Sequence, residues 1–181
     1  MHRRLELLRL LYDPLAYYRP WAKVAMEFQP AQRSALNAWL CQKYQLPAYS
    51  AVADAHASLT TRLVQGWGRL PITVYLMACA KHRPQLLASR QLLHQSVRVQ
   101  NFLRLPFAAS VQPLTGAVEQ DRMQAWGWQY LHAGLRDQMP AWLLTRMSLY
   151  SVGLPTEVCA ETEEFDFACF WSAWNYAANL S

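Results

Sequence analysis

The chain has 181 residues, 53% of them hydrophobic and 16% charged, a composition that excludes an intrinsically disordered polypeptide and allows one packed domain. Its four cysteines form no CxxC pair and no zinc-type spacing, which favours a reducing compartment over a disulfide framework. The longest uncharged run, residues 167–181, is shorter than the ~20 apolar residues that a membrane span needs. The leucine-rich N-terminus is interrupted by Glu6 and Arg9, whereas the core of a signal peptide would be apolar throughout. We therefore expect a soluble intracellular protein without direct membrane insertion.

The net charge of +5 is distributed unevenly along the chain. Residues 1–104 carry fourteen Lys and Arg against four Asp and Glu, whereas residues 105–181 carry three against eight. Such asymmetry is typical of two halves that attract each other, of two surfaces that bind different partners, or of a nucleic-acid-binding protein.

Apolar periodicity and the positions of proline predict three helices within residues 1–47. The first is amphipathic, and its apolar face consists of Leu5, Leu7, Leu8, Leu11 and Tyr12. Asp13 is expected to cap a short helix that begins at Pro14 and ends before Pro20. The third helix begins at Pro30, and its core stripe consists of Leu36, Trp39, Leu40 and Tyr44.

A helix capped by Ser50 and stopped by Gly66 precedes the segment that we expect to organise the fold, residues 67–83. This segment turns at Leu70-Pro71 and continues as a buried helix, because its apolar residues recur at spacings of three and four. It ends on cations that suit a helix C-terminus, namely Lys81, His82 and Arg83.

Beyond Pro84 the basic residues fall on roughly one helix face, but a single straight helix would place Leu87 in the middle of that face. We therefore expect a break near Gln95-Ser96 and a separate short helix up to Leu105. Residues 106–118 contain two prolines and a glycine, which predicts a linker.

The second half contains three further predicted helices: residues 119–137, one that begins at Pro140, and one from Thr162 to about Leu180. The last helix carries an aromatic stripe of Phe167, Phe170, Trp171 and Trp174. Such a stripe packs into a core by default and would dock a partner if it were exposed.

No segment alternates with period two over a long stretch, and β-branched residues are sparse. The expected fold is all-α, a single irregular bundle of about seven to nine short helices. We expect a basic helical half in residues 1–105, a linker in residues 106–118 and an acidic, aromatic-rich helical half in residues 119–181, together forming one compact domain.

The sequence contains no phosphate loop and no GxGxxG, HExxH or GxSxG motif, and we expect no catalytic, cofactor-binding or metal-binding residue. Cys79 and His82 lie three apart, but apolar surroundings would raise the pKa of the thiol, which favours a structural role over a Cys–His nucleophile pair. A face with Arg83, Arg90 and Arg98 could meet phosphates, so a small basic helical nucleic-acid-binding protein is the alternative function. An enzyme is the third class considered.

Two blocks of the sequence resemble the SctK family of bacterial type III secretion systems, and within it the OrgA/MxiK branch. The first block is Tyr12-Asp13-Pro14-Leu15-Ala16-Tyr17, which is similar to a DPLSY-like element of that branch. The second is WGRLPITVYLMACAKHR at residues 67–83, which is similar to a W-x-R-L-P-x-x-x-Y-L-x-x-C-x-K-x-R-like element. The resemblance covers residues 1 to about 105, whereas residues 106–150 match only as a helical pattern and the last helix does not match.

The resemblance implies a non-enzymatic adaptor of the cytoplasmic sorting platform beneath the secretion channel. Family members join the cytosolic domain of the inner-membrane ring protein (SctD) to the pod protein (SctQ), and through the platform they connect indirectly to the stator and the ATPase. The implied location is the bacterial cytoplasm at the cytosolic face of the inner membrane. The implied role is in injectisome assembly, protein secretion and virulence, without nucleic acid as a partner.

We expect mainly structural roles for the motif residues. Asp13 would cap a helix, and the remaining structural positions are Pro14, Tyr17, Trp67, Leu70, Pro71 and Tyr75. The candidates for a charged partner-binding face are Arg69, Lys81, Arg83 and Arg90. A purely structural role for these four residues is equally open.

Overall fold

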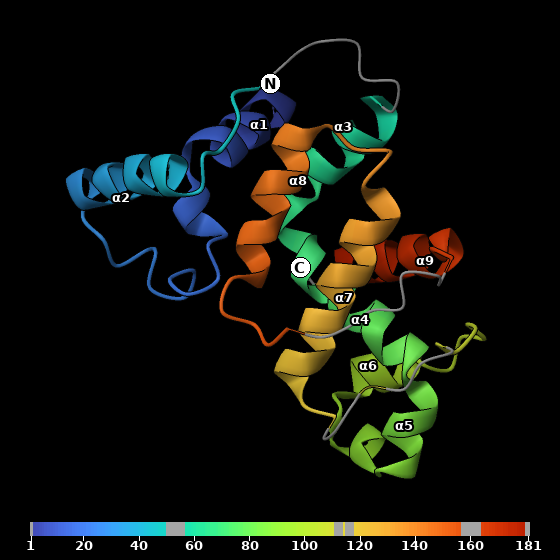
Figure 1. The fold of residues 1–181 in the computed structure, drawn as a ribbon. Helices are drawn as coiled ribbons and strands as arrows, with labels where there is room; N and C mark the ends of the chain where they lie inside the picture. Colours follow the sequence, from blue (N-terminus) through green and yellow to red (C-terminus); the bar gives the residue numbers. More distant parts are fainter. Residues whose placement is uncertain (1, 50–56, 111–113, 115–117, 157–163, 180–181) are drawn as a thin grey trace. The chain divides into compact units, whose positions relative to one another are not determined.

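A computed structural model describes residues 2–49, 57–110, 114, 118–156 and 164–179, and in these residues the chain forms α-helices, short 3-10 segments and no strands (Figure 1). The α-helices are α1 (His2–Tyr12), α2 (Pro30–Lys43), α3 (Ala57–Gln65), α4 (Leu70–Lys81), α5 (Arg83–Ala88), α6 (Val97–Phe102), α7 (Gln120–Leu135), α8 (Ala141–Met147) and α9 (Phe167–Ala178). The 3-10 segments are η1 (Pro14–Ala16), η2 (Trp67–Arg69), η3 (Gln91–His94) and η4 (Ser148–Ser151). The predicted all-α fold is confirmed, and the helices of the described residues agree in number with the prediction, while the predicted cap at Ser50 lies outside these residues.

The chain divides into two compact units, and each is built from two separate stretches of sequence. Unit 1 consists of Met1–Gly68 and Leu135–Gly153, and unit 2 consists of Arg69–Gly134 and Leu154–Ser181. In the described part of the chain, no helix has the length and apolar character needed to cross a membrane.

The core of unit 1 collects apolar side chains from α1, η1, α2, α3 and α8. Helix α1 contacts α3 and η1, and α2 contacts η1. The buried residues include Leu10, Leu11, Leu15, Leu40, Leu63, Trp67, Leu143 and Met147. The segment after Asp13 is a single 3-10 turn, shorter than the helix to Tyr18 that the sequence predicted.

Two predicted apolar faces in unit 1 are wrong in part. On α1, Leu11 is buried with Leu10, whereas Leu5, Leu8 and Tyr12 are exposed, because α1 turns its other side toward the core. On α2, Leu40 is the one fully buried residue, and 42% of Trp39 is exposed. Trp39 stacks instead on Trp21, with ring centroids 5.7 Å apart.

The centre of unit 2 is α4, which packs along α9 and also contacts α5 and α6. Nine of its residues are buried, as predicted for the segment that organises the fold. Helix α7 approaches α4 closely at Gly127, where an added Cβ atom would stand 2.4 Å from the carbonyl oxygen of Val74. Of the predicted aromatic stripe of α9, Phe170 and Trp174 are buried, Trp171 is half-buried and Phe167 is exposed.

The basic stretch after α4 contains one more break than the sequence predicted. The expected break is present, because Gln95 is extended and the side chain of Ser96 accepts a hydrogen bond from the Val99 backbone N–H at 3.3 Å. An additional break occurs at Arg90, whose φ of 58° is left-handed. This conformation separates α5 from η3 and turns the chain without a glycine.

Candidate partner-binding site

The early motif and the start of the second motif meet in one aromatic cluster inside unit 1. The ring of Tyr17 packs edge-on against Trp67 with centroids 5.6 Å apart, and Tyr150 lies 5.7 Å from each of them. The Tyr17 hydroxyl donates to the Leu10 carbonyl at 2.8 Å, and the Tyr150 hydroxyl donates to the Trp67 carbonyl at 3.3 Å. Burial raises the pKa of Tyr17 and Tyr150 above the ordinary tyrosine value, so both remain neutral donors.

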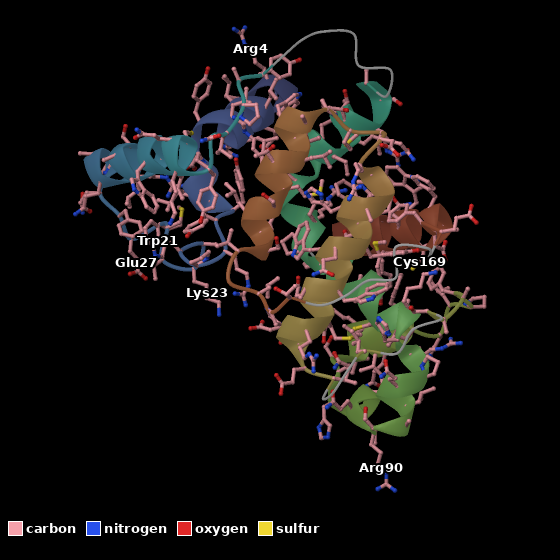
Figure 2. All side chains as sticks on the ribbon, viewed as in Figure 1. Arg4, Trp21, Lys23, Glu27, Arg90 and Cys169 are labelled. Carbon is pink, nitrogen blue, oxygen red and sulfur yellow. The ribbon has the colours of Figure 1, made fainter. Side chains whose placement is uncertain are left out.

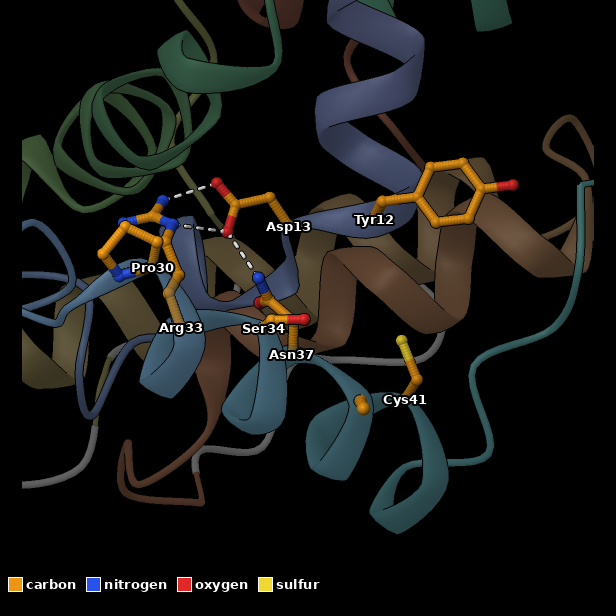
Figure 3. A pocket seen from close by; sticks show the side chains of 8 residues that line it. Tyr12, Asp13, Pro30, Arg33, Ser34, Asn37 and Cys41 are labelled. Carbon is orange, nitrogen blue, oxygen red and sulfur yellow. Dashed lines mark hydrogen bonds and ion pairs between the residues drawn. The ribbon is translucent and has the colours of Figure 1, made fainter.

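Asp13 does not cap the helix that follows it, which corrects the prediction from sequence. The side chain of Asn37 takes that role and accepts from the Leu15 backbone N–H at 2.9 Å. The Asp13 carboxylate instead forms an ion pair with Arg33 and accepts from the Asn37 amide at 2.9 Å (Figure 3). Asp13 therefore ties α2 to the end of α1, while Pro14 begins the 3-10 turn as expected.

The motif residues at the start of α4 are packed and hydrogen-bonded within unit 2. Leu70 is fully buried, and the carbonyl of Pro71 accepts from the Gln124 amide at 3.1 Å. The Tyr75 hydroxyl donates to the side-chain oxygen of Gln95 at 2.6 Å, and burial raises its pKa. These contacts attach α4 to α7 and to the segment before α6.

The four basic residues proposed for a partner-binding face do not lie together on the surface. Lys81 is only 4% exposed, and its ammonium pairs with Asp166 at 3.2 Å inside unit 2, which favours the structural role left open for this residue over a partner-binding one. Arg83 donates to the carbonyls of Leu103 and Leu105 at 3.0 and 3.3 Å, after the end of α6.

The two remaining arginines differ in their surroundings. The guanidinium of Arg69 lies 5.9 Å from the ring of Trp174, within cation–π range. Arg90 is exposed, and Figure 2 shows its side chain extending away from the ribbon. Of the four candidates, Arg90 is thus the residue best placed to meet a partner.

A hollow of about 500 Å³ lies in unit 1 between the end of α1 and one face of α2. Its lining includes Tyr12, Asp13, Arg33, Ser34, Asn37 and Cys41. Figure 3 shows Tyr12 on one side of it and Cys41 on the other. Tyr12 lines the hollow and also ends the exposed apolar row of α1. We call the hollow and this row together the α1–α2 groove: Leu5, Leu8 and Tyr12 with Ser34, Asn37 and Cys41.

Unit 2 has an exposed surface of a different kind in residues 83–105. Leu87, Leu93 and Val97 are exposed there, in a stretch that also exposes Arg90 and Arg98. We call these five residues the α5–α6 surface. Several exposed apolar residues among charged ones in one stretch are typical of segments that contact other proteins.

Sequence reasoning missed the α1–α2 groove for two reasons. Leucines occupy two faces of α1, so periodicity alone does not say which face is buried. On α2, Arg33, Asn37 and Cys41 recur every four residues, which is a signal for a shared face. The larger residues Leu36, Trp39 and Leu40 outline a different face of α2, and they give the stronger signal in the sequence.

Nucleophilic catalysis by the Cys79–His82 pair is disfavoured by its surroundings. Cys79 is fully buried, and burial raises the pKa of its thiol to about 12, which keeps it protonated at neutral pH. The ring of His82 stacks edge-on against Trp126 at 4.5 Å. In the residues that the structure describes, no three His, Cys, Asp or Glu side chains gather as metal ligands would.

The chain is similar in sequence to the oxygen-regulated invasion protein OrgA of Salmonella typhimurium, in strains 14028s, SL1344 and LT2. Each is 29% identical to it over 144 residues, which cover 78% of this chain and 71% of the relative. No solved structure matches the chain. The model of a family described as bacterial type III secretion apparatus protein (OrgA_MxiK) matches residues 7–177, which extends well beyond the first 105 residues that contain the two motifs. The chain therefore belongs to the OrgA/MxiK family of bacterial type III secretion apparatus proteins.

Proposed function

We propose that this chain is a non-enzymatic adaptor of the type III secretion sorting platform. It would link the cytosolic domain of the inner-membrane ring protein (SctD-like) to the pod protein (SctQ-like), at the cytosolic face of the inner membrane. The stator and the ATPase would be connected through the platform rather than by direct contact. Family membership supports a place in the secretion apparatus, and the bridging role is our inference.

The observation that carries the proposal is that each compact unit has its own exposed apolar surface, with basic residues within it or beside it. Unit 1 has the α1–α2 groove, and unit 2 has the α5–α6 surface. A bridging protein needs two such surfaces that two partners occupy at the same time. Binding energy at protein interfaces concentrates in a few large side chains within a polar rim, and both surfaces offer this combination.

Nucleic-acid binding is less well supported than bridging, because several basic residues are engaged inside the protein. Arg33 pairs with Asp13, and Lys81 pairs with Asp166. Arg83 is bonded to two backbone carbonyls. Phosphate binding draws on exposed Lys and Arg side chains, and each internal contact removes one from that set.

The test is a binding experiment with the purified full chain and each of the two components, first separately and then together. The wild-type chain is expected to bind each component and to form a complex that contains all three proteins. Arg90→Glu with Arg98→Glu reverses the charge of the α5–α6 surface and is expected to abolish binding of one component while the other still binds. Arg136→Glu, at an exposed site outside both surfaces, is the matched control and should change neither.

Circular dichroism of each variant establishes that a loss of binding is not a loss of folding. Binding of neither component by the wild-type chain would refute the adaptor function. If the chain were also retained on DNA in a manner that falls steeply with salt, the nucleic-acid alternative would replace it.

A further inference from the structure

Helix α1 has two apolar faces, and only one of them is used inside the protein. Leu10 and Leu11 are buried, whereas Leu5, Leu8 and Tyr12 are 50%, 41% and 72% exposed. The spacing of three and four residues places these exposed side chains in one row along the helix. The row is about 10 Å long at ~1.5 Å per residue, which is about two helical turns.

This row leads into a hollow whose shape is held by hydrogen bonds. Tyr12 belongs to both, and the floor of the hollow contains the network of Asp13, Arg33 and Asn37. Arg33 also donates to the Ala25 carbonyl at 2.6 Å, which fixes α2 at a second point. Because the groove exists before a partner binds, binding does not have to order it, and this favours affinity.

The charge of α1 is positive, with three Arg and one Glu, whereas in the hollow Asp13 offsets Arg33. At ~100° per residue, Arg4 and Arg9 lie about 70° to either side of the exposed row. Glu6 pairs with Arg9 at 3.2 Å, yet the Arg9 side chain stays 74% exposed, and Figure 2 shows Arg4 extending into solvent.

We propose that the α1–α2 groove binds an amphipathic α-helix of a partner protein whose apolar stripe is flanked by Asp and Glu. The apolar side chains of that helix would cover Leu5 and Leu8 and enter the hollow beside Tyr12, and its carboxylates would meet Arg4 and Arg9. The inference rests on the proposed bridging function, to which it adds the place and the chemistry of one contact.

Two other occupants fit these observations less well. An extended peptide adds to a free strand edge, and the groove is built from helices, whose backbone groups bond within the helix. An anionic membrane surface would attract Arg4 and Arg9, but it would leave the hollow at Tyr12 unfilled. A helix has both the apolar stripe and the width to occupy the row and the hollow together.

The test uses the full chain with the photoreactive residue p-benzoylphenylalanine at position 12, in cells that assemble the secretion apparatus. A second chain with the same residue at position 93 is the matched control, since Leu93 is 75% exposed in unit 2. Mass spectrometry then identifies the cross-linked segment. We expect position 12 to cross-link to a helical segment with Asp and Glu flanking an apolar stripe, and position 93 not to cross-link to that segment.

Purified variants supply the second measurement. Leu8→Ser with Tyr12→Ser is expected to weaken binding of one component at least about tenfold, whereas Leu93→Ser leaves that affinity unchanged. Arg4→Glu with Arg9→Glu is expected to slow association and to remove most of its dependence on salt.

Several results would overturn the inference while leaving the adaptor function in place. They are a cross-link to a second copy of this chain, to lipid, or to a segment without acidic residues, and unchanged binding in the Leu8/Tyr12 double variant. If the wild-type chain binds neither component, the adaptor function is refuted. The segment that cross-links to position 12 then still shows whether the α1–α2 groove binds an acidic amphipathic helix.

Discussion

The buried pair of Lys81 and Asp166 gives a sharp test of how unit 2 is held together. Asp166→Asn keeps an N-cap for α9, since asparagine caps helices about as well as aspartate, but it removes the charge that faces Lys81. Breaking a buried pair by removing one partner costs about 3–5 kcal/mol, because the other charge stays in a poorly solvated site. Since 21% of the Asp166 side chain is exposed, we expect the lower end, about 3 kcal/mol.

A loss of about 3 kcal/mol corresponds to a fall in Tm of roughly 6–12 °C for a chain of this size. Urea or thermal unfolding of the full chain, followed by far-UV circular dichroism, measures it. In the double variant Lys81→Met and Asp166→Asn the unpaired charge is absent, so most of the stability should return. A double variant no more stable than Asp166→Asn alone would show that the ion pair is not the reason for the loss.

Three further predictions concern single residues. Gly127→Ala should lower stability by about 2 kcal/mol in urea unfolding, because the new methyl group would stand 2.4 Å from a backbone oxygen of α4, and the cost of overpacking exceeds the gain of about 1 kcal/mol in helix propensity. Gly68→Ala, with open space around the site, should not lower stability, and equal effects of the two would contradict the packing argument. Asp13→Ala should speed hydrogen exchange in α2 through loss of its bonds to that helix, whereas unchanged exchange would mean that other contacts hold α2. At pH 7 a thiol reagent should modify Cys41 in the folded chain and leave Cys79 unmodified until denaturant is added, because Cys79 is buried and its pKa is raised to about 12. Mass spectrometry measures the modification, and early modification of Cys79 would refute its burial.

Local patterns were sufficient to predict most of the helices. Helix signals depend on residues close together in the sequence. Examples are the proline at the start of α2, the apolar spacing of α4 and the helix break before Ser96, and the structure has these features where the sequence predicts them. The break at Arg90 was missed because arginine in a left-handed conformation carries no signal of its own, unlike glycine or asparagine.

The candidate site was harder to predict, because it depends on contacts between distant residues. Lys81 looked like a helix-terminal cation, and its partner Asp166 lies far along the chain, so its burial had no local sign. Asp13 followed by Pro14 has the pattern of a helix cap, but Arg33 and Asn37 compete for its carboxylate. Which face of a leucine-rich helix is buried is likewise decided by its neighbours.

The way the chain is shared between the two units has a practical consequence. The polypeptide passes from one unit to the other three times, after Gly68, Gly134 and Gly153. A truncation that removes residues 119–181 would delete α8 from unit 1 and α9 from unit 2 in the same step. Binding at both proposed surfaces would then be lost together, and the result would wrongly suggest one shared docking region. During synthesis, likewise, unit 1 cannot be completed until Gly153 has left the ribosome, although its first 68 residues emerge at the beginning.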